Sequence, residues 1–130
     1  YADPARWETQ VAEWANRHGD DHVVSWPTRA LRKTAEAIQA YTNAVMAGEL
    51  SHSGDVRLTR HMGNAVRLPM NFVDDNGRPL WLLQKERPDS LHKIDAAYAA
   101  FLSWRARLDA LEAGIGEGRS VYEERGILVL

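Results

Sequence analysis

The sequence predicts an α/β fold, because helical and extended segments alternate along its 130 residues. Apolar residues recur at helical spacing in several segments, and the pair Asn76-Gly77 between two apolar runs is a strong hairpin signal. The hydrophobic fraction of 45% and the charged fraction of 26% are ordinary for one globular domain with a core. We therefore expect a sheet with packed helices and a β-hairpin, and we expect the five tryptophans to lie in the core.

The first predicted helix begins near the start of the chain. Asp3 is a good N-cap and Pro4 a good first helical residue. Gly19 ends this helix. The following run "HVVSWP", at residues 22–27, is a short strand candidate that its proline ends.

Two more helices are predicted in the middle of the chain. The segment from Thr28 to Gly48 has an apolar stripe, and its final glycine is a natural C-terminal stop. Asp55 can cap the next helix, from Val56 to Arg67. Its apolar and polar residues separate onto two faces. The polar face carries Arg57, Arg60, Asn64 and Arg67.

The hairpin and the longest helix follow. A tight Asn-Gly turn needs positive φ at both loop positions. The last helix is predicted from Asp89 to Ala113, with Asp89 or Ser90 as its N-cap. Glycines then interrupt the pattern, which divides the chain into a domain at residues 1–113 and a flexible C-terminal tail at residues 114–130.

Composition narrows the function classes. The chain has no cysteine, which rules out a disulfide framework and a thiolate metal site. No apolar run approaches the ~18 residues of a membrane span, so we expect no membrane contact. The net charge of -2 indicates no global attraction to nucleic acid. Phosphate-binding glycine loops and the HExxH and GxSxG motifs are absent, so the carboxylates are the remaining candidates.

Asp95 is the carboxylate that the helical pattern explains least. It lies beside Ile94 at the edge of the apolar stripe. The helix dipole favours negative charge in the first turn of a helix. If the helix begins at Asp89 or Ser90, Asp95 lies past that turn and gains little from the dipole. A buried carboxylate needs a partner, and a metal ion would provide one. Asp95 is therefore either half-exposed and inert or part of a site.

The order of several short motifs resembles the C-terminal part of the large terminase subunits of phages. A helix ending in "GEL" leads to the histidine of "LSHSGD", followed by "NAV" at residues 64–66. A hairpin and a lysine come next, and then "KID" at residues 93–95 opens the last helix. "YADPARW" resembles the strand-end segment that carries another acidic residue, and "SVYEERGILVL" is similar to terminase tails of actinobacteriophages.

This resemblance implies the nuclease part of a DNA-packaging enzyme. Members of the family join an N-terminal ATPase to a C-terminal nuclease of RNase H-like fold, which cuts concatemeric viral DNA. The expected partners are double-stranded DNA, the portal protein and the small terminase subunit, in the host bacterial cytoplasm at the procapsid portal. The chain begins at Tyr1 without a methionine, and we expect a partial nuclease domain that lacks the first strands, the first catalytic aspartate and the ATPase.

The resemblance also implies site residues. Asp3 and Asp95 would be catalytic ligands of Mg²⁺ or Mn²⁺, which prefer oxygen donors. Two such ions would activate water and stabilise the leaving oxygen. His52 is a further candidate for contacting the metal site or DNA, or else a solvated loop residue. The candidate DNA-binding residues are Arg57, Arg60, Asn64, Arg67, Lys85 and Lys93, and the alternative is that they form only a solvated surface.

Two rival functions stay open. The first is a non-catalytic module that docks on the portal or on DNA through the tail and the arginine face. The second is a prophage remnant without activity. Binding of a divalent metal that requires both Asp3 and Asp95 distinguishes the nuclease from these rivals.

Overall fold

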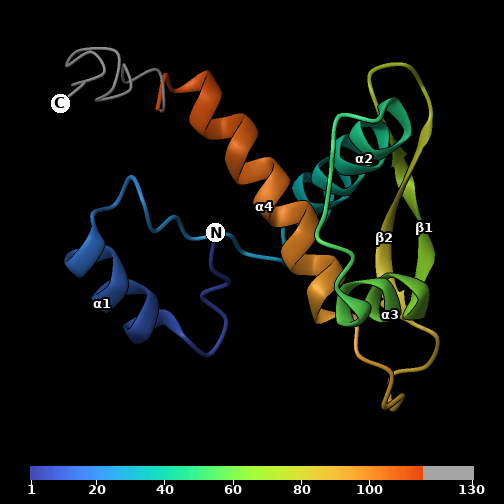
Figure 1. Cartoon of the computed structure of the whole chain (residues 1–130), viewed down its shortest axis with the longest axis horizontal. Helices are drawn as coiled ribbons and strands as arrows, with labels where there is room; N and C mark the ends of the chain where they lie inside the picture. Colours follow the sequence, from blue (N-terminus) through green and yellow to red (C-terminus); the bar gives the residue numbers. More distant parts are fainter. Residues whose placement is uncertain (116–130) are drawn as a thin grey trace, which may run out of the picture.

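The computed structural model describes residues 1–115, and the expected tail lies outside them from residue 116 onward. The described part is mixed α/β, with four helices and one two-stranded antiparallel sheet (Figure 1). The expected α/β class is therefore confirmed at this level. In chain order the elements are α1 (Glu8–His18), α2 (Leu31–Ala47), α3 (Val56–Asn64), β1 (Ala65–Val73), β2 (Pro79–Lys85) and α4 (Asp95–Glu112).

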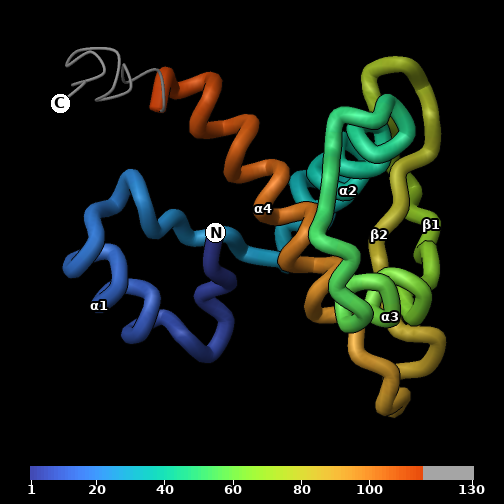
Figure 2. The backbone as a smooth tube through the Cα atoms, viewed as in Figure 1, coloured from blue at the N-terminus to red at the C-terminus, as the bar shows by residue number. Residues whose placement is uncertain are grey.

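The core forms where α2 packs against both β2 and α4 (Figures 1 and 2). Its largest fully buried side chains are Trp26, Phe101, Ile38 and Leu80. Burying a large aromatic or aliphatic side chain contributes about 1.5–3 kcal/mol, so this cluster anchors α4 onto α2 and the hairpin. The Tyr98 hydroxyl donates to the Leu83 carbonyl at 2.9 Å, which fixes α4 against β2 as well.

Helix α1 stands to one side of this core (Figure 2). Val11 is its buried residue, whereas Trp7 is 60% and Trp14 39% exposed. The expectation that all tryptophans are core residues is therefore wrong for α1. It holds for Trp26 and Trp104, which are buried.

The predicted start of the first helix is wrong. Helix α1 begins at Glu8, and the residue at its N-cap is Trp7, whose side chain makes no capping hydrogen bond. Arg6 has a left-handed φ of 68°, which interrupts any helix starting at Pro4. Asp3 instead accepts a hydrogen bond from the Ala5 amide at 3.0 Å, forming a local turn before the helix.

Tertiary pairing explains this difference at the N-terminus. Ala2 forms a parallel bridge with Ser25, its amide donating to Val24 O at 3.0 Å and its carbonyl accepting from Trp26 N at 2.8 Å. The predicted strand at residues 22–27 is reduced to this single bridge. Asp3 thus follows an extended residue and is held beside Thr28.

Helix α3 is shorter than predicted. Asp55 caps it as expected, accepting from Arg57 N at 2.7 Å. The helix ends at Asn64, however, and Ala65 is already extended. The chain then enters β1, whose pairing with β2 begins at Ala65, opposite Lys85. Arg67 therefore belongs to the sheet and not to the polar face of α3.

The predicted hairpin is present with a different turn. The expectation of positive φ at Asn76 is wrong, since only Gly77 of the pair has it, at 74°. The Gly77 amide donates to the Asp74 carbonyl at 3.0 Å, and Asp74 Oδ1 accepts from the amides of Asn76 and Arg78 at 2.9 and 2.8 Å. This is a turn followed by a left-handed glycine, which places one more residue in the loop.

The last helix begins later than predicted. It starts at Asp95, so Asp89 and Ser90 are not its N-cap. Ser90 is buried in the preceding loop, where its carbonyl accepts from Lys85 Nζ at 2.9 Å and its hydroxyl donates to Glu86. These loop contacts replace a helical turn that the sequence would also allow.

Candidate functional site

Asp3 and Asp95 line the same open pocket, which has a volume of about 560 Å³. The N-terminal segment supplies one carboxylate and the first turn of α4 supplies the other. The remaining lining residues are Tyr1, Thr28, Tyr98, Ala99, Leu102 and Ser103. The two carboxylates proposed as ligands therefore share one surface, although they lie far apart in the sequence.

Asp3 is half-buried and held by hydrogen bonds. Its Oδ2 accepts from the Thr28 hydroxyl and its Oδ1 from the Ala5 amide. Burial raises its pKa, but the bonds from Thr28 and Ala5, with the charge of Arg29, outweigh it and bring the pKa below the ordinary value. Asp3 is therefore ionised at neutral pH.

Asp95 has a simpler electrostatic setting. It is exposed and is the first residue of α4, not a residue beyond its first turn. A carboxylate there gains about 0.3–1 kcal/mol from the helix dipole. Its placement therefore has an explanation that needs no ligand, and this explanation does not conflict with a role in a site.

The two carboxylates of this pocket do not by themselves make up a metal-binding group. Within residues 1–115, no group of three or more His, Asp or Glu side chains is arranged to hold a metal ion. Asp3 and Asp95 offer the hard oxygen donors that Mg²⁺ and Mn²⁺ prefer, beside the hydroxyl of Thr28. A single dication held by these donors would keep several water ligands, as Mg²⁺ usually does, and the donors are too few for two ions.

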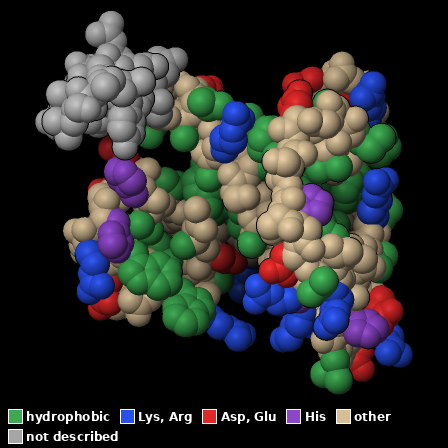
Figure 3. All heavy atoms as spheres, in the orientation of Figure 1, with side chains coloured by type: hydrophobic (Ala, Val, Ile, Leu, Met, Phe, Trp, Pro, Cys, Tyr) green, Lys and Arg blue, Asp and Glu red, His purple; other side chains and the backbone are tan. Residues whose placement is uncertain are grey.

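The predicted DNA-binding residues occupy several elements. Arg57 and Arg60 are exposed on α3, whereas Arg67 lies on β1 with its guanidinium 4.4 Å from the centre of the Trp81 ring. The expectation that these arginines share one helix face is wrong, because α3 ends before Arg67. Figure 3 shows Lys and Arg side chains gathered around α3 and the lower end of α4.

Several of these polar groups already have partners. Arg57 forms a salt bridge with Asp55, 2.7 Å between Nη2 and Oδ2, and its hydrogen bonds hold the pKa of Asp55 well below the ordinary value. Asn64 Nδ2 donates to the Lys93 carbonyl at 2.9 Å. Lys85 Nζ is bound to the loop before α4, as described above. Arg60 and the side chain of Lys93 make no salt bridge within the described part of the chain.

His52 lies in a different pocket. Its Nδ1 accepts from the Gly54 amide at 3.0 Å, and its ring lines a cavity of about 410 Å³ with Tyr41, Trp104 and Arg107. The structure does not bring His52 into the pocket of Asp3 and Asp95. The two pockets have Ser103 in common.

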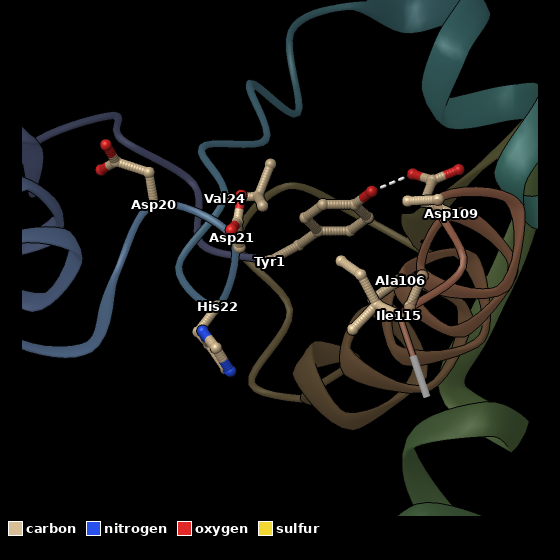
Figure 4. A pocket seen from close by; sticks show the side chains of 10 residues that line it. Tyr1, Asp20, Asp21, His22, Val24, Ala106, Asp109 and Ile115 are labelled. Carbon is tan, nitrogen blue, oxygen red and sulfur yellow. Dashed lines mark hydrogen bonds between the residues drawn. The ribbon is translucent and has the colours of Figure 1, made fainter. Parts of the chain in front are cut away.

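A third pocket, of about 250 Å³, separates the segment after α1 from α4 (Figure 4). Across it the Tyr1 hydroxyl donates to Asp109, which also pairs with Arg105. Burial and the charge of Glu112 raise the pKa of Asp109. In Figure 4 the side chains of Asp20 and His22 do not converge on Asp109, so this pocket gathers no metal-binding group.

Sequence reasoning missed Thr28 and His61. Thr28 was expected only as a helix start, and its bond to Asp3 joins segments on either side of α1. His61 Nδ1 accepts from the Ala96 amide at 2.9 Å, at the N-terminus of α4. No local pattern signals either contact, because each depends on how distant segments pack.

The chain is similar to proteins of two mycobacteriophages. It is 30% identical over 119 residues to the Gene 13 protein of Mycobacterium phage L5, which is 85% of this chain and 19% of that relative. It is 29% identical to the Gene 13 protein of Mycobacterium phage D29 over 119 residues, again 85% of this chain and 19% of that relative. The chain thus spans about a fifth of the length of these curated relatives. No family model and no solved structure matches it.

None of the helices in residues 1–115 combines the length and the apolar character needed to cross a membrane.

Proposed function

We propose that the chain is part of the nuclease domain of a phage terminase large subunit, a divalent-metal-dependent endonuclease that cuts concatemeric viral DNA. The shared pocket of Asp3 and Asp95 is the observation that supports this proposal most. Two carboxylates from segments that are distant in the sequence line this pocket. The similarity to mycobacteriophage proteins supports a phage origin.

In this proposal Asp3 and Asp95 hold Mg²⁺ or Mn²⁺. A bound ion would lower the pKa of a water molecule and stabilise charge on the leaving oxygen. Thr28 orients the Asp3 carboxylate through its hydroxyl. Arg60, Arg67 and Lys93 contact the phosphates of double-stranded DNA without reading sequence.

The proposed setting is the host bacterial cytoplasm, at the procapsid portal. Residues 1–113 belong to a partial RNase H-like domain in this proposal. The portal protein and the small terminase subunit are the proposed partners, and residues after Gly114 form the docking segment. The expected tail lies almost wholly outside the described residues, and the proposal for it rests on its sequence alone.

The proposed site is incomplete within this chain. Two dications repel each other and hold their hydration tightly, and Asp3 with Asp95 supplies too few negative oxygens for both. We therefore expect residues 1–130 to bind Mn²⁺ weakly and to cut DNA slowly or not at all. A longer chain that includes the segment upstream of Tyr1 should cut DNA.

Plasmid nicking with Mn²⁺ tests this proposal. The short chain, the long chain and Asp95→Asn in the long chain are compared at equal folding by circular dichroism. Asp89→Asn is a matched control, since Asp89 is an exposed carboxylate of the loop before α4. We expect cleavage only by the long chain and its Asp89→Asn variant. Full activity of the Asp95→Asn variant would exclude the proposed role of Asp95.

A non-catalytic module that binds DNA or the portal is the second candidate. It is favoured by the absence of a third metal ligand within residues 1–115 and by the exposed arginines of α3. In the same experiment this function predicts a long chain that retards DNA on a gel without nicking it, with or without Mn²⁺.

A further inference from the structure

Helix α3 holds the backbone on both sides of Asp95. His61 Nδ1 accepts a hydrogen bond from the amide of Ala96 at 2.9 Å, directly after Asp95. Asn64 Nδ2 donates to the carbonyl of Lys93 at 2.9 Å, two residues before it. Both side chains come from the last turns of α3, which packs against α4.

The bond to His61 replaces a cap that α4 does not provide for itself. Its N-cap residue is Ile94, which is buried and has no side chain able to accept a hydrogen bond. The first amides of a helix lack partners within the helix, so an acceptor from elsewhere stabilises them. His61 supplies that acceptor from another element, and this requires a ring with its proton on Nε2.

We propose that His61 and Asn64 are positioning residues for Asp95, an inference that rests on the proposed metal-dependent function. The side chain of Asp95 leaves the backbone between two fixed points, Lys93 O and Ala96 N. Rotation of the peptide units there would move the carboxylate relative to Asp3. Holding both points keeps the two carboxylates on the same pocket before a metal ion arrives, which lowers the cost of organising the site.

The same geometry gives Asn64 a different role from the one expected. Its amide nitrogen donates to a backbone carbonyl, which is a contact within the protein. Residues that orient a ligand commonly change metal affinity about 10- to 100-fold when they are lost. Because His61 and Asn64 act through the backbone and not on the carboxylate itself, we expect effects near the lower limit.

Calorimetric titration with Mn²⁺, together with amide exchange at Ala96 measured by NMR, tests the inference. His61→Leu removes the acceptor, and His61→Asn keeps one, because the amide oxygen of asparagine can take the place of Nδ1. We expect His61→Leu to speed exchange at Ala96 and to raise the Kd for Mn²⁺ about 10-fold, and His61→Asn to stay within about threefold of the parent chain. Asn64→Leu should raise the Kd in the same way as His61→Leu.

His92→Leu is the matched control. His92 lies in the loop before α4. Its Nδ1 contacts Glu86 Oε1 at 3.2 Å and not the backbone of the helix. It should leave both the Kd and Ala96 exchange unchanged. If His61→Leu fails to fold, His61→Asn and Asn64→Leu still decide the matter.

The outcomes separate this inference from the proposed function. Faster exchange at Ala96 with an unchanged Kd in His61→Leu would show a purely structural cap and would overturn the inference alone. An unchanged exchange rate would overturn it as well, since the hydrogen bond would then not protect the amide. A parent chain that binds no Mn²⁺, or an Asp95→Asn variant that binds equally well, would overturn the proposed function and this inference together.

Discussion

Thr28 donates a hydrogen bond from Oγ1 to Oδ2 of Asp3, and this contact joins the segments that flank α1. Burial alone would raise the pKa of Asp3, but this bond and the amide of Ala5 outweigh it, so the pKa is lowered from 3.8. A carboxylate with a lowered pKa in the folded state stabilises the protein above its unfolded-state pKa. That stabilisation is lost as the pH falls through the folded-state value.

Replacing Thr28 with valine should raise the pKa of Asp3, because burial remains and the side-chain donor is gone. The variant should be less stable than the parent at neutral pH, and the difference should shrink below the folded-state pKa of Asp3. A ¹³C carboxyl titration by NMR measures the pKa of Asp3. Urea unfolding at neutral pH and at a pH below that pKa measures the difference in stability. Thr59→Val, at an exposed position of α3, is the control. An unchanged titration of Asp3 would contradict the proposed contribution of Thr28.

The arginines should differ in their effect on DNA binding. Arg60→Ala and Arg67→Ala should each lower the slope of log affinity against log salt by about one unit, with uniform weakening across sequences. Arg57→Ala should have a smaller effect, because Asp55 already offsets its charge at 2.7 Å. Fluorescence anisotropy over a salt series provides the slopes, with Arg17→Ala on α1 as the control. If a variant with alanine at Arg57, Arg60 and Arg67 together keeps its affinity and slope, these residues form only a solvated surface.

The tryptophans test where the stability of the fold resides. Trp26 is fully buried in the core, so Trp26→Ala should cost about 3–5 kcal/mol of unfolding free energy. Trp7→Ala, at a position that is 60% exposed, should change it by about 0.5 kcal/mol or less. Chemical denaturation followed by far-UV circular dichroism compares them. Equal losses would mean that Trp7 contributes to the stability of the fold as much as the buried Trp26 does.

Two glycines give a matched test of backbone conformation. Gly77→Ala should cost about 1–2 kcal/mol, because its φ of 74° is left-handed, while an added Cβ would meet no atom within 4 Å. Gly63 lies within α3, where an added Cβ is also free of contacts, so Gly63→Ala should stabilise by about 1 kcal/mol. Thermal unfolding distinguishes the opposite signs. A stabilising Gly77→Ala would contradict the turn described here.

Features set by local chemistry were predictable from the sequence. Gly48 ends α2 in a left-handed conformation, Asp55 caps α3, and the hairpin forms around Gly77. In each case a short stretch of chain contains the whole cause.

Features set by distant contacts were not predictable in this way. Asp3 has the sequence context of a helix cap, yet the pairing of Ala2 with Ser25 overrides it. Asp95 opens α4 because contacts of the preceding loop and of His61 place the helix start there. Asp3 and Asp95 line one pocket, and neither residue's neighbours in the sequence point to the other.

Strand β1 has features that oppose pairing with a strand of another molecule. Its side chains are mostly exposed, including Val66 and Leu68, and such an apolar edge invites another strand to extend the sheet. Three features oppose this: the positive charge of Arg67, the missing amide proton of Pro69, and the irregular register between Pro69 and Val73. Arg67, which the sequence suggested as a DNA-binding residue, therefore opposes edge-to-edge aggregation through its charge.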